Sequence, residues 1–279
     1  MRKEVIRNSG ALLVLLLSAV GPASVLAADY SVPALKAETY VPPTWAAPRF
    51  GVVGSVAPTW TNNAFFSRDD RRSDWFFNGD VAVRMDGRFT PDLAYRLYAR
   101  SEIEPFARER DANVSMALWG ARLTQNVAGW SASVIYENRH SFAEIYGERL
   151  FIANDVKGAL ARIFTVGTVI LSPFVQGRYR FSGLPEAEYW RLDTALGIEA
   201  SLNERWSIIS SPFFEAYWFT GGTNAGRQDQ IYSGSIGVKY NITSSVSVSA
   251  NVAYEERRSN VAIRKYQNWD IGPRLDFAF

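Results

Sequence analysis

The chain ends on Trp269-Asp270-Ile271-Gly272-Pro273-Arg274-Leu275-Asp276-Phe277-Ala278-Phe279, and this stretch decides the fold. Its odd positions carry Trp, Ile, Pro, Leu, Phe and Phe, whereas its even positions carry Asp, Gly, Arg, Asp and Ala. A period of two predicts a strand with one apolar and one polar face. The strand that closes a transmembrane barrel ends in this way, because it must pair with the first strand to remove the open edge.

This alternation and its final aromatic resemble the C-terminal strand of Gram-negative outer-membrane β-barrel proteins. The resemblance implies a porin-like barrel in the outer membrane. In that class the closing aromatic residue is read during assembly, so the resemblance also implies that Phe277 and Phe279 form the assembly signal. The partners implied are the barrel-assembly machinery, periplasmic chaperones, and the lipid and lipopolysaccharide of the outer membrane.

The N-terminal residues have the pattern of a secretory signal. Arg2, Lys3 and Arg7 precede a short apolar run, and small residues follow up to Ala27. The run is too short to span a membrane, so residues 1–27 are predicted to be a cleaved signal peptide. Residues 28–48 contain four prolines and no sustained period, which predicts an extended periplasmic segment. The barrel is then expected to occupy residues 49–279.

The composition excludes several classes of function. The chain has no cysteine, so it has neither disulfides nor a cysteine nucleophile. Loss of residues 1–27 would remove three of the 30 basic and one of the 28 acidic side chains, leaving 27 of each. A formally neutral mature protein gives no indication of nucleic-acid binding.

Short stretches of alternating polarity continue along the rest of the chain. They predict an all-β fold, an antiparallel up-and-down transmembrane β-barrel of about twelve strands, with ten or fourteen as the alternatives. The candidate strands are 49–62, 77–89, 92–105, 112–124, 128–139, 149–165, 168–181, 189–202, 205–219, 230–242, 245–257 and 266–279. The register is uncertain by one residue in 112–124, 149–165 and 205–219.

The predicted connections alternate in length. The short ones are Thr90-Pro91, Asn126-Val127, Val166-Gly167, Asn203-Glu204 and Thr243-Ser244. The long ones are Asn63–Phe76, Phe106–Asp111, His140–Glu148, Ser182–Glu188, Gly221–Asp229 and Arg258–Lys265. Tight turns on the periplasmic side and longer loops outside are typical of a membrane barrel. The alternative, a secreted all-β domain with Greek-key connections, gives no reason for this alternation.

Aromatic residues gather at the ends of the predicted strands, where a membrane barrel carries two girdles. The girdle candidates are Trp75, Trp130, Trp190, Trp206, Trp218 and Trp269. The alternative is that tryptophan is simply a good strand former.

The polar faces of the strands predict a charged lumen. Its candidate lining residues are Arg84, Arg88, Arg96, Arg100, Glu102, Glu104, Arg178, Arg180, Arg191, Asp193, Glu199, Lys239, Glu255, Arg257, Asp270, Arg274 and Asp276. Opposing rows of arginines and carboxylates would select polar or charged solutes in a channel. In a closed barrel the same residues would pair across the interior and plug it. Twelve-stranded porins for acidic sugars use arginine tracks similar to residues 84–100, although acids are nearly as frequent here.

The sequence gives no convincing catalytic, metal or cofactor motif. A Ser–His hydrolase needs its two groups within hydrogen-bond reach. His140 is the single histidine, and its neighbour Ser141 should point to the opposite face of a strand. We therefore expect no enzyme and no cofactor, but a narrow passive channel for small polar or charged solutes. The alternatives are a plugged barrel whose basic outer loops bind lipopolysaccharide or external partners and, more distantly, a lipid-acting hydrolase.

Overall fold

The computed structural model describes residues 48–279. The predicted signal peptide, and all of the predicted periplasmic segment except Pro48, lie outside the described residues. The strands are β1 (Arg49–Thr61), β2 (Asp74–Arg88), β3 (Leu93–Glu104), β4 (Val114–Val127), β5 (Trp130–Ala143), β6 (Arg149–Ala161), β7 (Phe164–Val166), β8 (Val169–Ser182), β9 (Tyr189–Ser201), β10 (Trp206–Phe219), β11 (Gln228–Asn241), β12 (Val246–Ser259) and β13 (Tyr266–Ala278). Short 3-10 turns are η1 (Arg110–Ala112), η2 (Pro185–Ala187), η3 (Gly222–Asn224) and η4 (Ala262–Arg264). Within 48–279, no helix is both long and apolar enough to cross a membrane.

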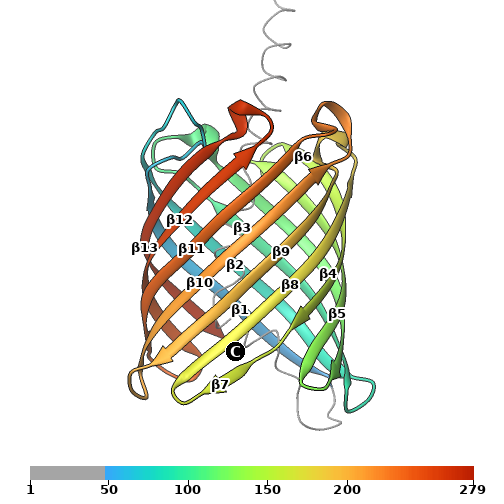
Figure 1. Cartoon of the computed structure of the whole chain (residues 1–279), viewed down its shortest axis with the longest axis vertical. Coiled ribbons are helices and arrows are strands. Elements are labelled where there is room, and N and C mark those ends of the chain that lie inside the picture. The colour runs from blue at the N-terminus through green and yellow to red at the C-terminus, as the bar shows by residue number, and fades with distance from the viewer. Residues whose placement is uncertain (1–47) are drawn as a thin grey trace, which may run out of the picture.

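The strands form one closed antiparallel barrel (Figure 1). Strands that are neighbours in the chain pair with each other, except β6 and β7, and β1 pairs with β13 to close the ring. Both β6 and the short β7 pair with β8, so these two strands occupy a single place in the wall. The wall therefore has twelve strand positions, and the predicted fold is confirmed.

Closure involves the last residue of the chain. The backbone N–H of Val52 donates to the carbonyl of Phe279 at 2.8 Å, and the N–H of Phe279 donates back at the same distance. Gly54 lies opposite Phe277, and a β-carbon at position 54 would lie 2.7 Å from the Phe277 ring. Gly54 thus leaves room for an aromatic ring to cover the seam on the outer face. The edge that either strand would otherwise present is removed.

One predicted strand is interrupted. Residues 149–165 were expected to form a single strand, but the structure breaks it between Ala161 and Phe164. The register with β8 is the same on both sides of the break, and Pro173 lies opposite it. The N–H of Arg162 donates to the Pro173 carbonyl at 3.2 Å, whereas proline has no N–H to return. A missing ladder hydrogen bond therefore explains the separate β7.

The two ends of the barrel differ as predicted. At one end, here the turn end, the connections have two to four residues; at the other, the loop end, they have five to twelve. The turn predicted at Asn126-Val127 lies instead at 128–129, where Ala128 and Gly129 both have positive φ, as the tightest hairpin turns require. β5 also runs further than predicted, so His140 lies inside the strand and not in a loop.

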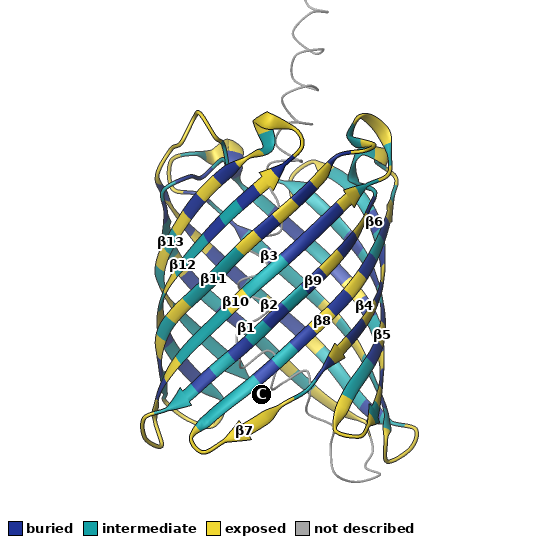
Figure 2. Ribbon diagram, in the orientation of Figure 1, coloured by how far each residue is buried: buried dark blue, intermediate teal, exposed yellow. Residues whose placement is uncertain are grey.

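Exposure alternates along the strands (Figure 2). In β9, Arg191, Asp193 and Glu199 are buried and face the interior, whereas Trp190 and Leu192 are exposed on the outside. The opposite register would place three charges against lipid, where each arginine or lysine near mid-membrane costs about 2–4 kcal/mol. The six tryptophans predicted for the girdles all have exposed side chains on the outer face, mostly at or next to strand ends.

Candidate functional site: the charged interior

The structure places every predicted lining residue on the interior set of alternate strand positions. Those on the β2–β3 wall are interleaved with acids. Arg96 Nε lies 2.6 Å from Asp86, and Arg84 Nε lies 3.2 Å from the same carboxylate. The predicted arginine ladder is therefore interrupted by carboxylates and is not a continuous track of positive charge.

The other predicted residues of this wall also have polar partners. Arg100 Nε lies 2.7 Å from Glu102, and Arg100 Nη2 lies 3.4 Å from Asp80. Glu104 accepts a hydrogen bond from Asn78 at 2.8 Å. Arg88, near the turn end, donates to the backbone carbonyl of Pro91 at 3.1 Å.

Predicted residues of β9 and β11 to β13 also meet partners. Lys239 pairs with Glu199, and the Tyr266 hydroxyl donates to Glu255. Arg274 Nε lies 2.7 Å from Asp276 on the same strand. Two further predicted residues, Arg257 and Asp270, contact Asp229 at 3.9 Å and Asn268 at 2.9 Å respectively.

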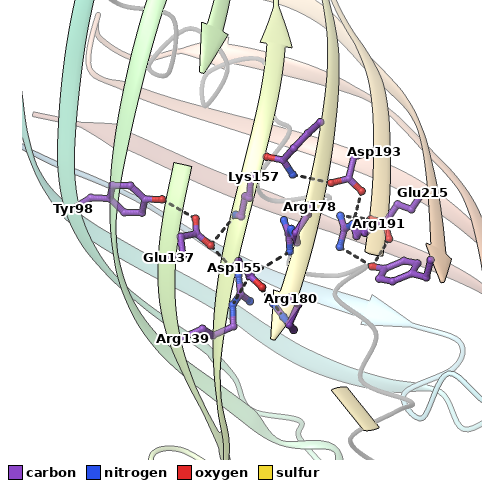
Figure 3. Close-up of polar contacts among 12 residues, drawn as sticks. Tyr98, Glu137, Arg139, Asp155, Lys157, Arg178, Arg180, Arg191, Asp193 and Glu215 are labelled. Carbon is purple, nitrogen blue, oxygen red and sulfur yellow. Dashed lines mark hydrogen bonds and ion pairs between the residues drawn. The ribbon is translucent and has the colours of Figure 1, made fainter. Parts of the chain in front are cut away.

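The densest cluster of charges lies on β5, β6, β8, β9 and β10, and the sequence revealed only part of it. We call it the charged belt (Figure 3). Its members are Glu137, Arg139, Asp155, Lys157, Arg178, Arg180, Arg191, Asp193 and Glu215. Sequence analysis missed Glu137, Arg139, Asp155, Lys157 and Glu215. In β6 the period-two spacing of Asp155 and Lys157 was the available signal.

Three of the missed residues, Glu137, Arg139 and Glu215, shared one difficulty. β5 and β10 carry apolar side chains on both faces, because Ile135 and Phe213 point inward beside the charged positions. Alternation is then too weak to identify the interior face. Only pairing with β4, β6, β9 and β11 determines the direction of these side chains.

On β5, β6 and β8 the belt is a chain of ion pairs. The Tyr98 hydroxyl donates to Glu137 at 2.7 Å, and Lys157 Nζ lies 2.7 Å from the same carboxylate. Arg180 donates two parallel hydrogen bonds of 2.7 and 2.8 Å to Asp155. Such bidentate pairs are the strongest ion pairs that proteins make.

On β9 and β10 the belt centres on Arg191, whose side chain is fully buried. It donates to Asp193, to Glu215 at 2.9 Å and to the Tyr217 hydroxyl at 2.6 Å. Tyr217 in turn donates to Glu215 at 2.6 Å. Burial of a charge costs several kcal/mol, and the hydrogen bonds from Arg191 to these three acceptors offset that cost.

Across the ring from β8 lies β1, whose interior-facing residues beyond Arg49 at the turn end are all small. They are Gly51, Val53, Ser55, Ala57, Thr59 and Thr61. Long charged side chains on one wall thus face short side chains on the other. The β1 wall therefore contributes little side-chain volume to the interior.

The loop end carries a further group of arginines. Arg227 binds Asp229 through its Nε and Nη2 atoms, and its guanidinium lies 3.9 Å from the centre of the Phe219 ring. Burial, followed by the neighbouring Arg227 and Arg257, lowers the pKa of Arg264 to about 10. Three arginines around one carboxylate make this part of the mouth electropositive.

The residues considered for catalysis do not come together. His140 Nε2 lies 2.9 Å from Asn138, and Ser141 follows it on the opposite face of β5. Glu102 and Glu104 are paired with Arg100 and Asn78, as described above. In residues 48–279, no three histidine or acidic side chains are grouped closely enough to hold a metal ion.

Comparisons with known proteins agree with this architecture. Residues 192–277, from β9 to β13, match a family model described as "Putative beta-barrel porin 2". Among solved structures, the COG4313 outer membrane channel from Pseudomonas putida F1 is 10% identical, with a TM-score of 0.53, over 86% of this chain and 100% of that one. The chain therefore has the closed β-barrel fold of this outer membrane channel.

Two other solved barrels are similar in outline. The translocator domain of the autotransporter NalP from Neisseria meningitidis is 8% identical, with a TM-score of 0.48 over 94% of this chain and 99% of that one. An anion-selective porin from Comamonas acidovorans is 8% identical, with a TM-score of 0.45 over 84% and 99%. At these identities the likeness concerns the fold alone. A search of curated protein sequences finds no match.

Proposed function

We propose that this barrel is a narrow passive channel for small polar or charged solutes in the outer membrane. The observation that carries the proposal is the contrast between the charged belt and β1. The charged belt gives solutes hydrogen-bonding partners, and the small side chains of β1 leave room beside the belt. The match of β9 to β13 to a porin family model also supports it.

The orientation follows from the two ends. Outer-membrane barrels keep short turns in the periplasm and longer loops outside. The turn end and Phe279 would then lie on the periplasmic side, where the assembly machinery would read Phe277 and Phe279. Residues 1–27 would direct export, and the six tryptophans would lie at the two membrane interfaces.

A plugged barrel is the second candidate, and one observation favours it. Away from the rims, the interior-facing residues of β4 to β9 are all buried. Function would then lie in the loops, where lipopolysaccharide phosphates could meet the arginines at the mouth. Several loop charges already have protein partners, however, because Arg72 lies 2.8 Å from Asp70 and 3.1 Å from Glu109. The hydrolase has the weakest support, since His140 has no serine or acidic partner in the described part of the chain.

Current through single molecules in a planar lipid bilayer distinguishes a channel from a plug. We expect discrete openings from the folded protein. The double substitution Arg96→Gln and Arg100→Gln should change the ion selectivity, since it removes two interior charges. Discrete openings whose selectivity is unaffected by the substitutions would place the path elsewhere, and folded protein without openings would exclude the channel.

A further inference from the structure

The register of the wall brings three cations into one row. Lys157 on β6 lies directly opposite Arg178 on β8, and Arg178 lies directly opposite Arg191 on β9. All three side chains face the interior and are buried. Like charges at directly opposed positions destabilise a sheet, so each of these cations needs an anionic partner.

Two of the three have one. Lys157 binds Glu137 at 2.7 Å, and Arg191 is enclosed by Asp193 and Glu215. Arg178 differs, because its nearest carboxylate oxygen is Asp155 Oδ2, 3.8 Å from Nη1. Figure 3 shows Arg178 between Asp155 and Arg191. Asp155 is already held by both hydrogen bonds from Arg180.

A second arginine, Arg139, also has no close carboxylate partner. Arg139 Nε lies 3.8 Å from the same Asp155 oxygen, and Arg139 Nη2 lies 3.6 Å from Glu137. Within residues 48–279, the Nε atoms of Arg139 and Arg178 are both buried and have no hydrogen-bond partner. Since both arginines approach one oxygen, the two approaching nitrogens lie no further apart than twice 3.8 Å.

The local charge is unbalanced as well. On β5, β6 and β8 the belt holds four cations, Arg139, Lys157, Arg178 and Arg180, against two carboxylates, Glu137 and Asp155. A buried guanidinium without a full partner costs free energy that a bound anion would recover. Arginine presents planar donors that match the oxygens of carboxylates and phosphates.

We propose that Arg139 and Arg178 form an oxyanion-binding site in the interior, which takes small solutes bearing a carboxylate or phosphate group. This inference rests on the proposed channel for its role in permeation, where it would make the pore favour such anions. Binding itself requires only that an anion can enter the barrel.

Inorganic phosphate is the probe, measured on the full folded barrel in detergent. Phosphate should raise the midpoint of thermal unfolding above that in chloride at the same ionic strength. Arg178→Gln should raise the phosphate concentration for half the effect about tenfold or more, because it removes a charge-assisted hydrogen bond. Arg139→Gln should act in the same direction and serves as the second variant.

The matched control is Arg258→Gln, which makes the same charge change at an exposed position paired with Glu256. It should respond to phosphate as the native protein does. An equal response of the Arg178, Arg139 and native proteins would overturn the site. Phosphate stabilisation without any current in bilayers would support the site and exclude the channel. Current that phosphate neither blocks nor modulates would support the channel and exclude a role of the site in permeation.

Discussion

At the scale of single residues, the barrel depends on the completeness of each buried ion pair. Arg191 shows this most clearly, because three acceptors surround a guanidinium that has no exposed surface. Arg178 lies directly beside it in the sheet and has no such set. Substitution of these two arginines, which occupy adjacent positions of one row, is therefore expected to lower stability to very different extents.

Arg191→Gln should lower the free energy of unfolding by about 3–5 kcal/mol, since it leaves Asp193 and Glu215 buried without their cation. Urea unfolding of the protein in lipid vesicles measures this value. Arg178→Gln in phosphate-free buffer is the comparison and should cost much less. An Arg191 variant as stable as the native protein would show that the network does not support the wall.

The sequence could predict residues of this kind only where alternation is clean. Arg191 and Asp193 were found because Leu192 and Leu196 mark the opposite face of β9. Glu215 was missed because β10 has apolar side chains on both faces. Which carboxylate meets which guanidinium depends on the pairing of neighbouring strands, and a single strand carries no such information.

At the scale of elements, the pairing of β1 with β13 is the step that makes a barrel from a sheet. The last residue, Phe279, contributes two backbone hydrogen bonds to this pairing. The side chain of Phe279 takes no part in these bonds. The aromatic ring and the backbone of Phe279 can therefore be tested separately.

Phe279→Ala should leave the stability of protein refolded in detergent nearly unchanged, since both backbone hydrogen bonds to Val52 remain. It should nevertheless reduce the amount assembled in the outer membrane of cells, because the proposed assembly signal would be lost. Deletion of Phe279 should reduce both. The amount in membrane fractions and the urea midpoint give the two readings, and normal assembly of the alanine variant would refute the signal.

Element boundaries were mostly predictable within one to three residues, and the exceptions have physical reasons. Pro173 is visible in the sequence, but its effect on β6 requires knowledge that Arg162 lies opposite it. The Ala128-Gly129 turn escaped prediction because alanine seldom adopts positive φ.

At the scale of the whole molecule, barrel closure and strand number follow from the alternating polarity of the strands and from the alternating lengths of the connections. The width of the lumen does not, because it depends on side chains from strands that never pair. The contrast between the long residues of the belt and the small residues of β1 appears only when the ring is closed. That contrast is the basis of the proposed channel.

Osmotic swelling of liposomes tests this central claim most directly, because it measures passage of the solutes themselves. Liposomes containing the folded barrel should swell rapidly in small uncharged polar solutes and progressively more slowly as the solute becomes larger. Liposomes with heat-denatured protein provide the baseline. Swelling no faster than this baseline in the smallest solute would contradict the channel and leave a plugged barrel.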